Sequence, residues 1–351
     1  MRNHNPFPDR CGPDSVPEGL RGSRKENGSD RRAKPRIVFS RCLGFDHCRY
    51  DGNIVEDAFV KELGEYVHCI TPCPEADIGM GIPRKPVIVV TQEDKHGMLQ
   101  PATGKDFTRP MEEYIDSFIA GLGRVHGFVL KSGSPSCGLT DAKFFEESGK
   151  PISQRRGAGL FGAAVLKFFR DIPVIDEKRL GDASARTTFL TRIFVMAEFD
   201  AVTGKRNFEA VSDFHERHAI LLGAIDPSAA SGLAAIVAGS SGGTGSRDEV
   251  SLYRRTLAGV LARGFARSSF EPALEAILER ISGKLAGSGK STLKSIADSY
   301  ARGILDESAC MEALADLVEE SGVEDSMVRS FAMPFPPSLF GARRLHFHET
   351  G

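Results

Sequence analysis

The sequence predicts an α/β N-terminal domain with a mostly parallel sheet, followed by an all-α helical domain. Its length of 351 residues suits two domains at about 150 residues each. Short β-rich runs alternate with amphipathic stretches up to about residue 175, which is typical of parallel sheets with helices on their faces. From about residue 208, strand signals disappear and helical periodicity replaces them, which predicts the second domain.

The predicted α/β domain covers residues 35–197. It begins with a β-rich run at 36–40, a glycine-containing loop and an amphipathic stretch at 55–65, which indicate a strand, a loop and a helix. The same patterns predict further strands near 66–70, 87–91, 127–131 and 173–175, and helices near 111–122 and 159–170. In such sheets, ligands bind in the loops beyond the carboxyl ends of the strands.

The predicted helical domain covers residues 208–337. Its periodicity indicates helices at 208–223, 227–238, 249–265, 269–285, 290–302 and 308–321. The remaining segments are polar or rich in glycine and lack this periodicity. We therefore expect a disordered basic arm at 1–34, a linker at 198–207 and a flexible tail at 338–351.

The composition excludes several classes of protein. Hydrophobic residues make up 41% and charged residues 26%, as in ordinary globular proteins. The longest nearly apolar stretch, around residues 233–238, is far shorter than the ~20 residues of a membrane-spanning helix. The polar, basic N-terminus has no apolar core of a secretory signal, so we expect a cytoplasmic protein. The odd number of cysteines, seven, argues against a disulfide framework and favours metal ligation, catalysis or simple burial.

Three cysteines come directly after predicted strands: Cys42, Cys73 and Cys137. Because the carboxyl ends of parallel strands share one edge of a sheet, the three loops can meet around one metal centre. Thiolate ligands select zinc, copper(I) or iron-sulfur centres. Cys48 lies in the first loop and is either a fourth ligand or a neighbouring thiol. Cys69 lies within a predicted strand, which favours simple burial, and burial remains the alternative for the whole set.

The residues around these cysteines resemble those of a known family. Four runs together resemble the thiouracil desulfidase family over roughly residues 35–195. They lie at 42–52 (CLGFDHCRYDG), 73–75 (CPE), 79–84 (GMGIPR) and 134–138 (SPSCG). The resemblance implies a 4Fe-4S cluster on Cys42, Cys73 and Cys137, with Cys48 as a possible fourth ligand. It also implies that a thiocarbonyl sulfur is replaced by oxygen without net redox change.

The resemblance also assigns roles beside the cluster. Glu75 would be the acid or base, and Ser134 or Ser136 would assist the substrate or the cluster. A carboxylate that caps a backbone N–H is the alternative for Glu75. Arg49 and Arg84 flank the cysteine loops, where they would hold a phosphate or a uracil oxygen, or form structural ion pairs.

The second half resembles the helical domain that accompanies this desulfidase domain in longer members of the family. The matching features include His215 and His218 of the first helix, and the run at 279–283 departs from the family pattern. Two-domain members of this layout look like tRNA 4-thiouridine desulfidases, which implies that the helical domain binds tRNA. The candidate RNA-binding residues are Arg254, Arg255, Arg263, Arg267, Lys290 and Lys294. Residues 204–336 carry fourteen basic and eighteen acidic side chains, so RNA binding requires that these charges segregate in space.

The sequence thus predicts an iron-sulfur desulfidase that acts on thiolated uridine in tRNA. A free thiouracil base or a thiouridine nucleotide is the alternative substrate. The alternative from another class is a non-catalytic metal or redox-sensing protein that binds RNA.

Overall fold

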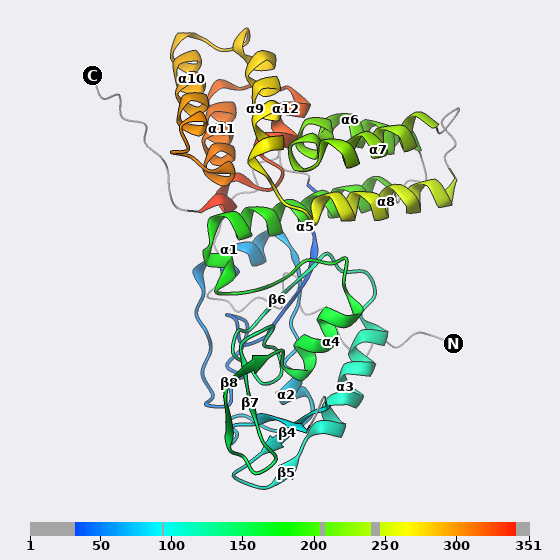
Figure 1. The fold of residues 1–351 in the computed structure, drawn as a ribbon, viewed down its shortest axis with the longest axis vertical. Helices are drawn as coiled ribbons and strands as arrows, with labels where there is room; N and C mark the ends of the chain where they lie inside the picture. The colour runs from blue at the N-terminus through cyan, green and yellow to red at the C-terminus, as the bar shows by residue number, and fades with distance from the viewer. Residues whose placement is uncertain (1–31, 93–94, 204–207, 240–245, 342–351) are drawn as a thin grey trace, which may run out of the picture. The chain divides into compact units, whose positions relative to one another are not determined.

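The computed structural model describes residues 32–92, 95–203, 208–239 and 246–341. The chain divides into two units, Met1–Gly181 and Asp182–Gly351. The first unit contains strands and helices, and the described part of the second contains helices only (Figure 1). The predicted fold class is therefore confirmed.

The first unit is built on a four-stranded, fully parallel sheet. Its strands are β1 (Arg36–Phe39), β2 (His68–Ile70), β6 (Gly127–Leu130) and β9 (Val174–Asp176), in the order β2-β1-β6-β9. In register, Ile37 of β1 lies beside Cys69 on one side and Gly127 on the other. Cys69 is buried within β2, as the sequence indicates. The four strands end at the same edge, and this edge carries the cysteine loops.

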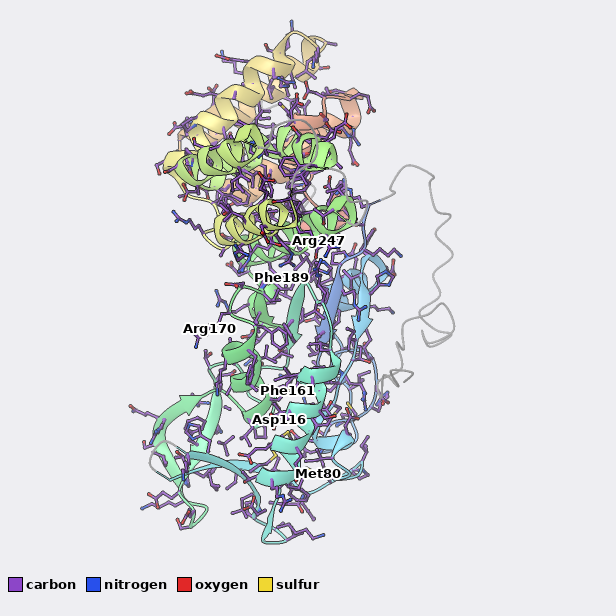
Figure 2. The ribbon with its side chains drawn as sticks, turned by 90° about the vertical axis from the view of Figure 1, so that its right-hand side faces the viewer. Met80, Asp116, Phe161, Arg170, Phe189 and Arg247 are labelled. Carbon is purple, nitrogen blue, oxygen red and sulfur yellow. The ribbon has the colours of Figure 1, made fainter. Side chains whose placement is uncertain are left out.

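Helices pack against this sheet. They are α1 (Ala58–Tyr66), the short α2 (Pro74–Asp77), α3 (Thr108–Gly121) and α4 (Leu160–Phe168). Asp57 begins α1, because its side chain accepts the N–H of Val60 at 2.9 Å. Phe118 of α3 meets Phe161 of α4 edge to face, with ring centroids 5.4 Å apart, in the core of the unit. Phe161 is labelled in Figure 2.

A second sheet was only partly anticipated. Its order is β5-β4-β3-β7-β8, and its strands are β3 (Ile88–Gln92), β4 (Lys95–Gln100), β5 (Lys105–Asp106), β7 (Ala142–Phe145) and β8 (Pro151–Gly157). The prediction that residues 87–91 belong to the parallel sheet is wrong, because β3 pairs with β4 and β7 instead. The other four strands escaped prediction because β5 and β8 are almost fully exposed and lack apolar alternation.

The second unit consists of helices. They are α5 (Ala183–Thr203), α6 (Phe208–Ile225), α7 (Pro227–Gly239), α8 (Arg247–Leu261), α9 (Arg267–Ser282), α10 (Gly287–Ala301), α11 (Glu307–Ser321) and α12 (Ser326–Ala332). The polar starts of several helices are capped, as at Ser246, which forms a capping box with Glu249. Gly322, at a φ of 63°, ends α11 in the left-handed conformation. Within this unit, α8 packs against α5, α6 and α7, whereas α10 packs against α9 and α11 (Figure 1).

The boundaries of the predicted segments change in two places. Residues 198–203 of the predicted linker continue α5, and the division between the units falls after Gly181 instead. Helix α5 is buried on most of its circumference, so it has no amphipathic stripe from which its extent could be read. Part of the predicted tail forms the short 3-10 helix Pro337–Phe340, in which Leu339 and Phe340 are buried. Residues 1–31, 204–207 and 342–351 lie outside the described residues, so the predicted arm and the rest of the linker and tail stay predictions.

Within the described ranges, no helix combines the length and the apolar character that crossing a membrane requires.

Candidate active site lined by cysteines

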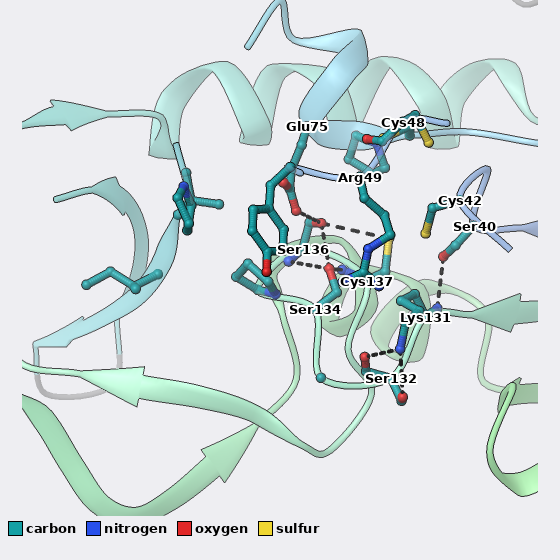
Figure 3. Close-up of a pocket in the computed structure, with 18 of the residues that line it drawn as sticks. Ser40, Cys42, Cys48, Arg49, Glu75, Lys131, Ser132, Ser134, Ser136 and Cys137 are labelled. Carbon is teal, nitrogen blue, oxygen red and sulfur yellow. Dashed lines mark hydrogen bonds between the residues drawn. The ribbon is translucent and has the colours of Figure 1, made fainter. Parts of the chain in front are cut away.

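A cavity of about 560 Å³ lies at the carboxyl edge of the parallel sheet, and all of its lining residues belong to the first unit. Nine of the residues singled out in the sequence line this cavity. They are Cys42, Cys48, Arg49, Cys73, Glu75, Arg84, Ser134, Ser136 and Cys137. They come from three separate loops, and seven of them are labelled in Figure 3. The topology explains this convergence, because β2, β1 and β6 are neighbours in the sheet and each precedes one cysteine loop.

The first loop brings two thiols to the cavity. It is closed by a hydrogen bond from the N–H of Val55 to the carbonyl of Cys42 at 2.8 Å. Cys48 is fully buried, and its thiol interacts with the thiols of Cys42 and Cys73. The hydrogen bond with Cys42, together with burial, raises the pKa of Cys48 to about 12. The structure thus places Cys48 among the other thiols rather than behind them.

The second loop begins with Cys73 directly before the short helix α2. The backbone N–H of Cys73 donates to Oδ2 of Asp77 at 3.1 Å. Arg41 pairs with Asp77 at 2.8 Å, and the hydroxyl of Tyr114 donates to Asp77 at 2.9 Å. This network fixes the cysteine backbone. The hydrogen bond with Cys48 and burial together raise the pKa of the Cys73 thiol well above its ordinary range.

The third loop is the most tightly packed. The Ser134 hydroxyl accepts the N–H of Cys137 at 3.0 Å and that of Ser136 at 3.2 Å. The start of α4 closes on this loop, because the N–H of Gly162 donates to the carbonyl of Ser136 at 2.9 Å. A Cβ on Gly159 would lie 2.5 Å from the carbonyl oxygen of Pro135, so the close approach requires glycine there. Ser134 therefore holds the loop in shape.

Glu75 is a buried carboxylate of the cavity and is only 8% exposed. Its Oε2 accepts from Nη2 of Arg84 at 2.7 Å and from Nε at 3.0 Å, and its Oε1 accepts from the hydroxyl of Ser136 at 2.7 Å. Both carboxylate oxygens thus bind side chains, unlike those of a helix cap. The Ser136 hydroxyl also lies 3.8 Å from the sulfur of Cys137. Ser136 therefore connects the carboxylate to a cysteine.

The two arginines of the cavity differ in role. Arg84 is committed to the protein, because it pairs with Glu75 and also donates to the carbonyl of Cys48 at 3.0 Å. Its guanidinium therefore positions Glu75 and the first cysteine loop. Arg49 is more exposed, with its Nε 3.3 Å from Asp51 and its guanidinium 5.7 Å from the centroid of the Tyr50 ring. Arg49 thus remains accessible to a ligand.

The sequence reasoning missed a polar cluster beside the cysteines. Lys131 pairs with Glu177 at 2.6 Å, and the Ser132 hydroxyl donates to the same Oε1 of Glu177 at 2.6 Å. The Ser40 hydroxyl accepts the N–H of Lys131 at 2.9 Å and also interacts with the thiol of Cys137 (Figure 3). Ser40, Lys131 and Glu177 each follow directly after a strand of the parallel sheet. The reasoning that found the cysteines therefore applies to them as well.

The donor set fits an iron-sulfur cluster. Four thiols reach one cavity, and burial raises the pKa of Cys137 to about 12. A coordinating metal removes such protons, so buried thiols of this kind suit metal ligation. Within the described ranges, no three Cys, His, Asp or Glu side chains converge closely enough to hold a single metal ion.

The RNA-binding candidates of the second unit do not form one group. Arg254 pairs with Asp200 at 3.0 Å, and Arg263 pairs with Asp226. Arg267 lies 4.6 Å from the centroid of the Tyr300 ring and donates to the carbonyl of Tyr300 at 2.7 Å. The remaining candidates are exposed and lie on two separate helices, α8 and α10: Arg255, Lys290 and Lys294.

The two histidines of α6 serve packing. His218 is 2% exposed, and its Nδ1 lies 2.9 Å from the carbonyl oxygen of Phe214. Nδ1 of His215 lies 3.0 Å from the hydroxyl of Tyr253. Both imidazoles therefore bind groups of the helical unit itself.

Comparisons with known proteins identify the family of the first unit. The family model of 2-thiouracil desulfurase matches residues 37–177. The uncharacterized protein YbbK of Bacillus subtilis (strain 168) is 30% identical over 157 residues, which is 42% of this chain and 98% of YbbK. A solved structure of the [4Fe-4S]-dependent thiouracil desulfidase TudS is 26% identical, covers 42% of this chain and 95% of its own, and superposes with a TM-score of 0.33. The chain therefore belongs to the 2-thiouracil desulfurase family, a family of enzymes that remove sulfur from thiouracil.

Proposed function

We propose that this protein is a 4Fe-4S-dependent desulfidase that replaces the thiocarbonyl sulfur of a thiolated uridine by oxygen, with 4-thiouridine in tRNA as its substrate. One observation carries the proposal. Three cysteines that follow neighbouring parallel strands line one cavity together with the paired side chains Glu75 and Ser136. The family membership and the name of the TudS structure support the same chemistry.

Cys42, Cys73 and Cys137 would hold the cluster, and the position of Cys48 makes it the candidate for a fourth ligand. When bound through three cysteines, the cluster supplies an iron with an open position that acts as a Lewis acid toward sulfur. Cys48, Cys73, Glu75, Ser136 and Cys137 are buried in the wall of the cavity, so these polar groups act at reduced dielectric.

Glu75 is the base for the attacking water. The overall reaction adds water to the thiocarbonyl carbon and releases hydrogen sulfide, so it consumes no electrons. Arg84 donates to Oε2 of Glu75, and Oε1 accepts from the hydroxyl of Ser136. Oε1 would therefore take the proton of the water as its oxygen bonds to the ring carbon, and would return it to the departing sulfur. The hydroxyl of Ser136 would orient this oxygen, to which it donates at 2.7 Å.

The tRNA substrate is supported by the two-domain layout, whereas the candidate cations of the helical unit do not form one group. Arg255, Lys290 and Lys294 are exposed and would contact phosphates, whose neutralisation dominates the affinity of proteins for RNA. Arg254, Arg263 and Arg267 would contribute less, because each is bound to groups of the protein.

The test is sulfide release by the full chain after anaerobic reconstitution with iron and sulfide. The wild type should show the visible absorption of a 4Fe-4S cluster and release sulfide from 4-thiouridine. Glu75→Gln should keep the absorption and lose the activity. Glu112→Gln, which changes an exposed carboxylate of α3, is the matched control and should match the wild type. A reconstituted protein that holds a cluster but releases no sulfide would instead be a metal or redox sensor.

The choice of substrate is tested by turnover at varied salt. Turnover on thiolated tRNA should fall steeply with salt, because phosphate contacts release counterions, whereas turnover on a free nucleotide should change little. Equal turnover on tRNA and on free thiouracil at every salt concentration would contradict the tRNA assignment and favour the small molecule.

A further inference from the structure

Arg41 connects the first two cysteine loops. It lies just beyond the end of β1 and directly precedes Cys42. Its backbone N–H donates to the carbonyl of Pro72 at 2.9 Å, and its Nε donates to the carbonyl of Thr71 at 2.8 Å. These two carbonyls belong to the residues that lead into Cys73. Arg41 therefore ties the first loop to the second through both its backbone and its side chain.

Asp77 completes this connection. It lies one helical turn after Cys73, and its N–H donates to the carbonyl of Cys73 at 2.8 Å. Nη2 of Arg41 lies 2.8 Å from Oδ1 of Asp77 and donates to Oδ2 at 3.0 Å. The same Oδ2 accepts the N–H of Cys73 and the hydroxyl of Tyr114. One carboxylate thus joins the guanidinium, the second cysteine and helix α3.

The charge of Arg41 also acts on the thiols. Arg41 lines the cavity, and its guanidinium interacts electrostatically with Cys73 and Cys48. The side chains of Arg41 and Asp77 are 26% and 21% exposed, so water screens this charge only in part. Among the residues that the structure describes, Nη1 of Arg41 has no hydrogen-bond partner, whereas Nη1 of Arg84 donates to the carbonyl of Cys48. Arg41 therefore keeps N–H groups that can donate to sulfur.

We propose that Arg41 is a positioning residue of the iron-sulfur centre: it joins the first and second cysteine loops through Asp77 and places a positive charge beside the ligand sulfurs. The inference rests on the proposed function, because it requires the cluster on these cysteines. The connection between the loops holds two ligands at a fixed separation, which slows the loss of iron. The positive charge opposes that of the thiolates, and net charge and hydrogen bonds to sulfur set the reduction potential of such clusters.

The experiment measures two properties of the cluster in the full chain after anaerobic reconstitution. The rate of iron release to a chelator reports how firmly the cysteines hold the cluster. The midpoint potential, from a titration followed by the EPR signal of the reduced cluster, reports the charge beside it. The variants are Arg41→Gln, Arg41→Lys and Asp77→Asn. Arg217→Gln is the matched control, because Arg217 pairs with Glu198 at 2.9 Å in the second unit, with side chains 34% and 39% exposed.

Arg41→Gln should release iron about tenfold to hundredfold faster than the wild type, since it loses charge-assisted hydrogen bonds that have about this effect. Its midpoint potential should become more negative, because a positive charge is removed. Asp77→Asn keeps an oxygen for the N–H of Cys73 but leaves the cation unpaired, so its potential should become more positive. Arg41→Lys should keep the wild-type potential but release iron faster, because an ammonium lacks the planar set of donors that reaches both Thr71 and Asp77.

Opposite shifts of the potential separate a charge effect from a structural one, because a general loosening of the loops would move both variants in the same direction. The inference is overturned if the potentials of Arg41→Gln and Asp77→Asn shift in the same direction or match that of Arg217→Gln. Iron release from Arg41→Gln at the rate of this control would also overturn it. If Arg41→Gln retains too little cluster for the titration, Arg41→Lys and Asp77→Asn carry the comparison of potentials. A wild type that shows the predicted cluster properties but releases no sulfide from 4-thiouridine would contradict the proposed function and leave the role of Arg41 intact.

Discussion

The ion pair between Arg84 and Glu75 gives the sharpest prediction on the architecture of the cavity. The side chains are 4% and 10% exposed, and Nη2 of Arg84 lies 2.7 Å from Oε2 of Glu75. Arg84→Met removes the cation and leaves a buried carboxylate with only the Ser136 hydroxyl. Removing one partner of a buried ion pair costs about 3–5 kcal/mol. We expect the free energy of unfolding of the first unit to fall by about this amount.

The assay is denaturant unfolding of the full chain, followed by a signal from the first unit. Glu75→Gln/Arg84→Met should recover part of the loss, because the orphaned carboxylate is gone, and a double-mutant cycle isolates the coupling. Arg109→Met is the matched control, since Arg109 pairs with Glu113 on the surface, with side chains 86% and 64% exposed. The reasoning is refuted if Arg84→Met changes the unfolding free energy no more than Arg109→Met does.

Three further predictions concern stability. Burial alone would raise the pKa of Asp325, but hydrogen bonds from Lys284 and Arg280 lower it to about 2 from 3.8. The contribution of the Asp325 carboxylate to the free energy of unfolding is therefore complete above pH 3.8 and is lost as the pH falls toward 2. Asp325→Asn should flatten the pH dependence of the unfolding midpoint in this window and nowhere else. Ser134→Ala removes the acceptor of two backbone N–H groups and should cost about 1–3 kcal/mol in urea unfolding; no change would mean that water replaces the hydroxyl. Gly159→Ala should destabilise by about 1–3 kcal/mol through overpacking, whereas Gly181→Ala, with nothing within 4 Å, should be neutral; equal unfolding midpoints would contradict the close packing.

The parallel sheet could be predicted because its strands are short apolar runs, and most helices because their apolar residues repeat with a helical period. Strand β1, for example, carries three fully buried residues in a row. The second sheet could not be predicted, since a strand such as β8 exposes most of its side chains and is held by backbone pairing with β7. Helix α5 was missed for the opposite reason, because apolar residues surround it on most sides.

The convergence of the cysteines could be anticipated, because parallel strands end at one edge whatever the loops do. The pairing of Glu75 with Arg84 could not be anticipated from the sequence. Between them the chain reverses through Gly79 and Gly81, both at positive φ, and only the folded loop shows that the guanidinium returns to the carboxylate. The sequence also left the place of Cys48 open, whereas the structure sets its thiol against Cys42 and Cys73.

The most direct test of the central claim is the sulfide released per uridine formed by the anaerobically reconstituted full chain. With 4-thiouridine as substrate, we predict that the wild type releases one sulfide for each uridine formed and that Cys73→Ser releases no sulfide. Cys69→Ala changes a buried cysteine of β2 outside the cavity and should release as much sulfide as the wild type. Equal activity of Cys73→Ser and the wild type would contradict the claim that the thiols of this cavity hold the reacting centre.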